Sequence, residues 1–160
     1  MLESHRRLYN ACLEQRKARY ETDKRSVKYT EQSAWFNTER TRNPYFARLN
    51  FSSAQATMRR RLEKAYKNFF GRVKQGDKEP GFPRFKARDR FDSIEFPAYG
   101  DGIRLNETKL RVQNVGVIRT KVHRPHAGVV KTATLQLEAG KWYVILSCDL
   151  GDVIIRLLRG

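Results

Sequence analysis

Apolar residues recur every three or four positions along the first half of the chain, which is the spacing of an amphipathic helix. The pattern predicts a first helix within residues 2–20, a second within residues 28–36, and a third that continues to Val73. The third helix has the clearest repeat, formed by Ala54, Met58, Leu62, Ala65, Tyr66, Phe69 and Val73. We expect Thr30 to cap the second helix, and Ser52 or Ser53 to cap the third, because short hydroxyl side chains satisfy free backbone N–H groups.

The pattern changes after Gln75-Gly76-Asp77 to short runs of β-branched or alternating residues separated by Gly, Pro and Asn. These runs predict strands at 91–96, 102–105, 109–112, 116–123, 129–138 and 141–150. Strands of this length and spacing favour a small antiparallel β-barrel. In the last hairpin, apolar residues occupy both faces around Trp142, so we expect it to be buried or packed on a neighbour.

The predicted fold class is therefore α+β, with a helical segment followed by the barrel. We divide the chain into a helical segment at 1–76, a basic linker loop at 77–90, a β-barrel at 91–150 and an atypical tail at 151–160.

The charge of the chain narrows the choice of partner. Thirty-three Lys and Arg against 17 Asp and Glu give a net charge of +16, most of it in the first 90 residues. Such an excess indicates an anionic polymer as partner, and nucleic acid is the leading candidate. No apolar run approaches the roughly 20 residues that span a bilayer, so we expect a cytoplasmic protein with no membrane partner.

The third helix carries a basic stripe opposite its apolar face, formed by Arg59, Arg60, Lys64 and Lys67. A solvated helix face is one interpretation of such a stripe. Phosphate contact is the other, because Glu63 is the one acidic residue nearby in sequence and the consecutive arginines repel one another.

The linker loop combines aromatic and basic residues in the segment GFPRFK at 81–86. Its candidate contact residues are Phe82, Phe85, Arg84, Lys86, Arg88 and Arg90. Cations neutralise phosphates, and an exposed phenylalanine can stack on an unpaired base. In the alternative, the two rings pin the linker onto the third helix and the barrel, and only the charges face outward.

Residues with catalytic or metal-binding chemistry are sparse. Cys12 and Cys148 lie far apart without paired Cys or His spacing, which is typical of reduced thiols. His123 and His126 flank a basic turn with no acidic neighbour in sequence, which favours a surface turn or a phosphate contact. We therefore predict no catalytic residue, no metal and no cofactor, and expect that the isolated chain is not an enzyme.

Four segments together resemble the TnpB, or OrfB, proteins of bacterial insertion sequences, which are often named transposases and are related to type V CRISPR nucleases. They are LYNACLEQR (8–16), YTEQSAWF (29–36), the run from Ser52 to Phe96 with its PGFPRFK motif, and GKWYVILSC (140–148). The resemblance implies part of an RNA-guided DNA endonuclease. The helices would form a recognition lobe and the strands a wedge-type barrel related to oligonucleotide-binding barrels. Structured guide RNA and duplex or heteroduplex DNA would be the partners.

Two departures from the family pattern shape the functional hypothesis. Family members have an extra strand before the first helix, and a RuvC-like nuclease with three acidic residues and a zinc-binding insert after the barrel. Here the first helix begins near Met1, and after Leu150 only Asp152 is acidic. We expect a nucleic-acid-binding portion without its own cleavage centre, for which a separate chain could supply the nuclease. A truncated RNA- or DNA-binding regulator of intact relatives and a remnant of a decayed insertion sequence are the alternatives.

Overall fold

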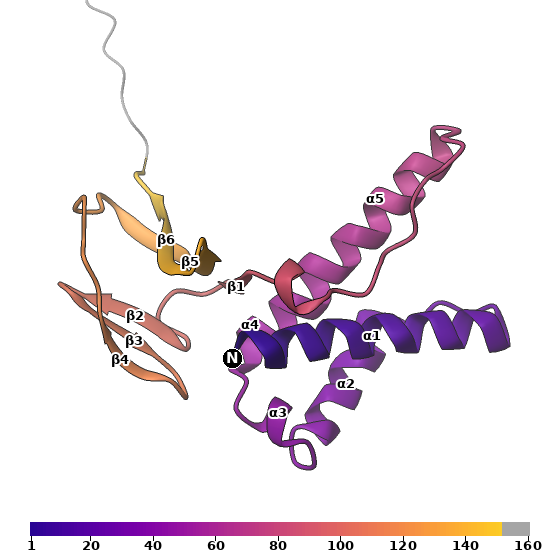
Figure 1. Ribbon diagram of the computed structural model, residues 1–160, viewed down its shortest axis with the longest axis horizontal. Coiled ribbons are helices and arrows are strands. Elements are labelled where there is room, and N and C mark those ends of the chain that lie inside the picture. Colours follow the sequence, from indigo (N-terminus) through magenta and orange to yellow (C-terminus); the bar gives the residue numbers. More distant parts are fainter. Residues whose placement is uncertain (152–160) are drawn as a thin grey trace, which may run out of the picture.

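A computed structural model describes residues 1–151 as a helical lobe beside two small sheets (Figure 1). The helices are α1 (Leu2–Asp23), α2 (Tyr29–Glu39), α3 (Pro44–Ala47), α4 (Phe51–Ala56), the π-helix η1 (Thr57–Leu62), α5 (Glu63–Lys74) and the 3₁₀ turn η2 (Arg88–Arg90). The strands are β1 (Ser93–Phe96), β2 (Ile103–Asn106), β3 (Lys109–Val112), β4 (Gly116–Arg119), β5 (Val129–Glu138) and β6 (Lys141–Asp149). The α+β class is confirmed. Asp152 and the expected tail, apart from Gly151, lie outside the described residues.

The helical lobe closes around one apolar core. In α1, Leu8 and Cys12 are fully buried on the face that meets the later helices, as the i, i+4 spacing predicts. The remaining core residues come from every helix up to η1 and from the chain just before β1: Tyr9, Leu13, Phe36, Phe46, Leu49, Ala54, Met58, Leu62 and Phe91. None of the described helices has an apolar stretch long enough to cross a membrane.

The helix starts differ from those predicted. Helix α2 begins one residue before Thr30, and the backbone N–H of Lys28 donates to the Glu31 side chain, so Thr30 as the cap is wrong. Asn50 caps α4, with its Oδ1 accepting from the Ser53 N–H at 2.9 Å, so Ser52 or Ser53 as the cap is also wrong. Asn caps as well as Ser does, and the local sequence did not separate them.

The predicted third helix is continuous, but it consists of α4, η1 and α5 in succession. The π-helical segment holds the three consecutive arginines. A π turn inserts one residue into the helical repeat and changes the direction of the side chains around it. This segment contacts both α1 and α4, so it lies at the centre of the lobe.

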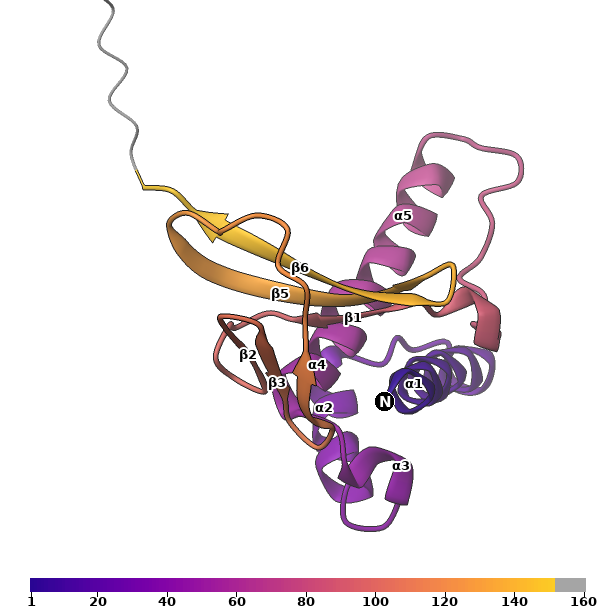
Figure 2. The ribbon, with the colours of Figure 1, turned by 60° about the vertical axis from the view of Figure 1, so that its left-hand side comes forward.

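The six strands form two antiparallel sheets, with strand orders β1-β5-β6 and β2-β3-β4. Figure 2 shows them facing each other, and between them lies a second core of Ile94, Phe96, Ile103, Leu110, Val112, Ala133 and Leu135. Among the described residues, no ladder joins the two sheets into the continuous barrel that we expected. The β5–β6 hairpin turns at Ala139 and Gly140, both with positive φ, which matches the twist of a two-residue hairpin.

Of the two expectations for the last hairpin, burial of β6 on both faces is wrong, whereas Val144 and Leu146 do pack against the second core on the inner face. Trp142 and Ile145 are 54% and 51% exposed, and no residue of β6 is buried. Strand β6 pairs only with β5 in the described part of the chain, so it forms the edge of its sheet. Alternation of apolar residues predicted the strand correctly but did not reveal whether anything covers it.

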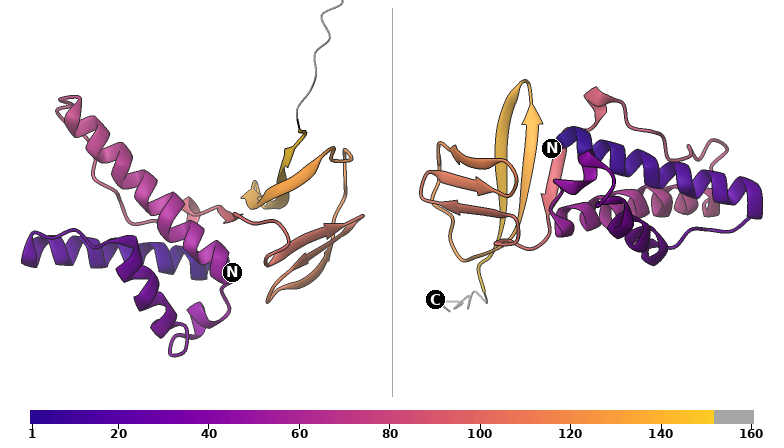
Figure 3. Two further views of the ribbon diagram at one scale, coloured as in Figure 1. Left: turned by 180° about the vertical axis from the view of Figure 1, so that it is seen from behind. Right: turned by 90° about the horizontal axis from the view of Figure 1, so that it is seen from below.

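Polar contacts connect the helical lobe to the sheets. Figure 3 shows the lobe on one side and the two sheets on the other. Arg60 of η1 forms an ion pair with Glu95 of β1. The Asn50 carboxamide donates to Asp101 Oδ1 at 3.1 Å and to Gln113 Oε1 at 2.8 Å. Leu2 packs against both apolar cores, so the two parts share contacts at several points.

His5 makes the helical lobe sensitive to acid. Its ring is fully buried, with Nδ1 lying 2.9 Å from Thr57 Oγ1, and burial lowers the pKa of His5 to about 3. Since the unfolded chain takes up this proton near pH 6.5 and the folded chain does not, the free energy of unfolding should fall as pH decreases from 6.5 towards 3. The slope should approach about 1.4 kcal/mol per pH unit. Urea denaturation at several pH values measures it.

The control is the His5→Gln variant, which keeps a polar group beside Thr57 but cannot titrate. It should lose most of the slope between pH 6.5 and 4.5, whatever its stability at pH 7. Equal slopes in the two proteins over that range would contradict this assignment.

Candidate nucleic-acid interface

The linker loop returns along α5 and is fixed to it (Figure 1). The Phe82 ring packs edge-on against Tyr66 and Phe69, with ring centroids 5.6 Å and 5.1 Å apart. The Arg72 guanidinium donates to the carbonyls of Pro80 and Gly81. The loop and α5 therefore form one rigid projection, and the interpretation in which Phe82 pins the linker onto the third helix fits these contacts.

Phe85 is the more open of the two loop phenylalanines. It is 48% exposed and Phe82 is 41% exposed. The Lys17 ammonium of α1 lies over both rings, 4.9 Å from the Phe85 centroid and 5.3 Å from that of Phe82. Nothing in the sequence indicated that Lys17 would belong to this surface, because Lys17 lies some 65 residues before the loop and on another helix.

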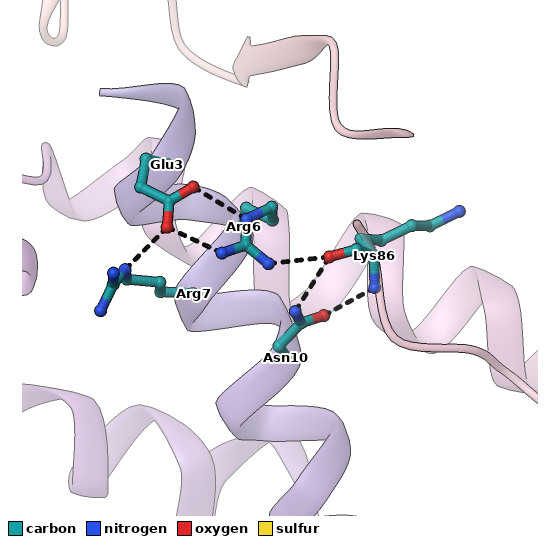
Figure 4. Close-up of polar contacts among 5 residues, drawn as sticks. All are labelled: Glu3, Arg6, Arg7, Asn10 and Lys86. Carbon is teal, nitrogen blue, oxygen red and sulfur yellow. Dashed lines mark hydrogen bonds and ion pairs between the residues drawn. The ribbon is translucent and has the colours of Figure 1, made fainter. Parts of the chain in front are cut away.

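The backbone of Lys86 is clamped onto α1 (Figure 4). Its N–H donates to Asn10 Oδ1 at 2.8 Å, and its carbonyl accepts from Asn10 Nδ2 at 3.0 Å and from Arg6 Nη1 at 2.9 Å. The Lys86 side chain points away from these groups. The clamp therefore fixes the loop through the Lys86 backbone, while the Lys86 ammonium group remains available to contact a ligand.

Glu3 holds the clamp in place. Its carboxylate accepts hydrogen bonds from Arg6 and Arg7 at 2.7–2.8 Å, and these two arginines lower the pKa of Glu3 to about 2. Arg6 can therefore reach Lys86 with its remaining donor in a fixed direction. Arg6 and Asn10 were not predicted from the sequence, because nothing local links them to Lys86, which lies 76 or more positions away.

The three consecutive arginines of η1 have different surroundings. Arg60 is paired with Glu95, so the expectation that Glu63 alone offers a counter-charge is wrong. Arg61 donates to Ser93 Oγ and lies 4.3 Å from the centroid of the Phe91 ring. Arg59 lies over the Tyr29 ring at 5.7 Å and is exposed. Two of these arginines thus join the helical lobe to the β1-β5-β6 sheet.

The other predicted cations lie on the surface. Lys64 and Lys67 are exposed on α5, Arg84 is exposed on the loop, and Arg88 and Arg90 are exposed in η2. Lys64 and Lys67 lie on the side of α5 away from Tyr66 and Phe69, where the loop packs, and the other cations lie on the loop and on α1. We call the whole exterior of this projection the α5–loop surface. Its members are Lys17, Lys64, Lys67, Arg84, Phe85, Lys86, Arg88 and Arg90.

The described residues include no group of three or more His, Cys, Asp and Glu placed to hold a metal ion. Asp149, the last residue of β6, accepts a hydrogen bond from the Gly151 N–H at 3.0 Å and lies 3.4 Å from the Lys131 ammonium. These contacts lower the pKa of Asp149. They are the contacts of a carboxylate that closes a turn.

The two loop phenylalanines should respond differently to truncation. Phe82→Ala should destabilise the chain by roughly 1–2 kcal/mol, less than a fully buried phenylalanine would, because the ring is partly exposed. It should also speed hydrogen exchange in residues 77–86. Phe85→Ala, the matched control, should change both quantities much less. Thermal denaturation with hydrogen exchange tests this, and equal effects of the two variants would contradict the role given to Phe82.

Comparison with known proteins gives one informative similarity. The chain is 26% identical over 145 residues to "Putative RNA-guided DNA endonuclease InsQ" of Escherichia coli strain K12, and the match covers 89% of the chain. It covers 34% of that relative, so the chain spans about a third of its length. No protein-family model matches the sequence. Over most of its own length the chain is thus similar to a protein named as an RNA-guided DNA endonuclease, which supports the resemblance that its motifs carry.

Proposed function

We propose that this chain is the nucleic-acid-binding portion of a TnpB-like, RNA-guided nuclease, and that it holds guide RNA and target DNA. The observation that supports this most is the α5–loop surface, a projection with exposed cations and a half-exposed phenylalanine on a fixed backbone. The similarity to InsQ supports the choice of RNA and DNA as partners, because that relative is named as an RNA-guided DNA endonuclease.

The chemistry of this surface fits an irregular or single-stranded region of a folded RNA. Lys64, Lys67, Arg84, Arg88 and Arg90 would neutralise phosphates, and the release of counterions would supply most of the affinity. Single-stranded loops present unstacked bases beside the phosphates. Phe85 would stack on one such base, a contact worth roughly 1–3 kcal/mol.

The clamp at Lys86 would reduce the cost of binding. A mobile basic loop has to lose conformational entropy when it meets its ligand, whereas this one is already held by Asn10 and Arg6. In our proposal Phe82 contributes by holding the loop in position on α5. Arg60 contributes mainly by its ion pair with Glu95 of β1. Arg59 and the outward part of Arg60 would add weaker phosphate contacts.

Cleavage of DNA by an enzyme of this kind needs carboxylates that hold divalent metal ions. Our proposal assigns that step to a part of the enzyme other than residues 1–151, with no catalytic role for Asp149. Duplex or heteroduplex DNA would be held by the same portion, and the cytoplasm would be the place of action.

The triple variant Lys64→Gln, Lys67→Gln, Arg84→Gln tests the α5–loop surface. Affinity for a structured RNA, measured by fluorescence anisotropy across a series of salt concentrations, should fall strongly. The slope of log K against log salt should become shallower by roughly 2–3, because each lost phosphate contact removes about 0.7–0.9 from it.

The matched control removes the same charge elsewhere, through Lys109→Gln, Arg111→Gln and Arg119→Gln on the exposed surface of β3 and β4. It should keep most of the affinity and most of the slope. Equal losses in the two triple variants would indicate binding by net charge alone and would contradict the proposed surface. A duplex DNA of equal length, titrated in parallel, shows which nucleic acid the surface prefers.

A further inference from the structure

Strand β6 presents a free edge for pairing. It is nine residues long and pairs only with β5 among the strands of residues 1–151. It contains no proline, and its one register irregularity with β5 lies on the β5 side, between Val130 and Thr132. An edge strand of this kind exposes a row of unpaired N–H and C=O groups, which natural proteins usually protect.

Large side chains of β6 are also exposed on both faces of the sheet, although Val144 and Leu146 pack partly against the second core. Trp142 lies on the face that holds the inner core, and Tyr143 and Ile145 lie on the opposite face. All three are about half exposed. Large apolar side chains gathered on one edge strand mark a contact surface more often than a solvated one.

An apolar groove runs beside this edge. Its volume is about 580 Å³, and it lies between β6 and the strands of the other sheet. The apolar residues that line it are Met1, Leu2, Leu110, Val112, Val115, Ile118, Leu135, Trp142 and Val144. Side chains of a strand added to the edge of β6 would enter this groove on the inner face.

We propose that β6 pairs antiparallel with β6 of a second copy of this chain. The nine residues overlap completely in one register, which is centred on Ile145 opposite Ile145 of the second copy. Tyr143 then lies opposite Ser147, and Val144 lies opposite Leu146. The β1-β5-β6 sheet of one copy and that of the other then become one six-stranded sheet. The pairing is the same from either copy, so it closes as a two-fold dimer.

Charge at the ends of the strand favours this register. It places Lys141 opposite Asp149 of the second copy, and the same pair forms again at the other end. Lys131 lies 3.4 Å from Asp149, and Glu138 is the partner of Lys141 in the β5 register. Each end of the interface therefore gathers two basic and two acidic side chains, and opposite charges directly across a sheet stabilise it.

The groove fits the second copy as well. In this register Leu146 and Cys148 of the second copy lie on the inner face, next to Val144 and Trp142. They would cover the exposed indole and fill part of the groove. The net charge of +16 on each copy opposes association, but the surplus cations lie mainly on the helical half, and salt screens charges more than about 8–10 Å apart.

The oligomeric state of the nucleic-acid-free protein tests the proposal. Sedimentation equilibrium should show a concentration-dependent dimer, and Ile145→Lys should make it monomeric by placing two like charges opposite each other. The matched control is Val117→Lys on β4, another half-exposed edge residue that lies outside the interface. A protein that stays monomeric at all concentrations would overturn the proposal, as would a dimer that Ile145→Lys leaves intact.

Charge reversal tests the register. Lys141→Glu and Asp149→Lys should each weaken the dimer at least severalfold, and the double variant should recover most of the loss. In a Cys148→Ser background, Ile145→Cys should form a disulfide between copies, because directly opposed residues bring their Cα atoms within disulfide range. Ser147→Cys, on the same edge and face, should not do so. Cross-linking at 147 rather than 145 would exclude this register.

Discussion

The joint between the π-helical segment and β1 is the contact on which the arrangement of this protein depends. Arg60 pairs with Glu95, and Arg61 reaches Ser93 and the Phe91 ring, so two consecutive arginines engage residues some 30 positions later. An α-helix separates consecutive side chains by about 100°, which makes such a double contact difficult. The extra residue of the π turn relaxes that restriction. Helix α5 continues directly from η1, so the joint lies at the base of the basic projection.

The sequence predicted the elements of the fold better than their surroundings. Helical spacing of Ala54, Met58 and Leu62 identified the third helix, because burial on one face is a local property of the pattern. The helix starts were wrong at Ser52 or Ser53 because Asn50 caps equally well, and at Thr30 because α2 begins after Lys28, which is not a typical capping residue. Burial of β6 was wrong because an alternating strand looks the same at an edge and at the centre of a sheet.

In the candidate interface too, some residues could be predicted from the sequence and others could not. Its cations other than Lys17, together with Phe85, were identified from the sequence, because charged residues and an aromatic residue among them can be recognised in a local segment. Its supports were not visible, since Asn10 and Lys17 come from a helix distant in sequence and have ordinary side chains for a helix surface. Glu95 was missed as the partner of Arg60 for the same reason. Long-range pairing leaves no local signal in a single sequence.

The acidic residues of this chain explain how it folds with so much positive charge. Several of them lie where cations would otherwise crowd the fold: Glu3 between Arg6 and Arg7, Glu95 at Arg60, Asp149 at Lys131. Cations held in such pairs already face a carboxylate, so they neutralise phosphates less well and release fewer counterions from a polyanion. The cations of the α5–loop surface have no ion-pair partner among the described residues. The formal charge therefore overstates the binding capacity of the molecule as a whole, while the α5–loop surface groups several unpaired cations on one projection, where a polyanion gains from contacting them together.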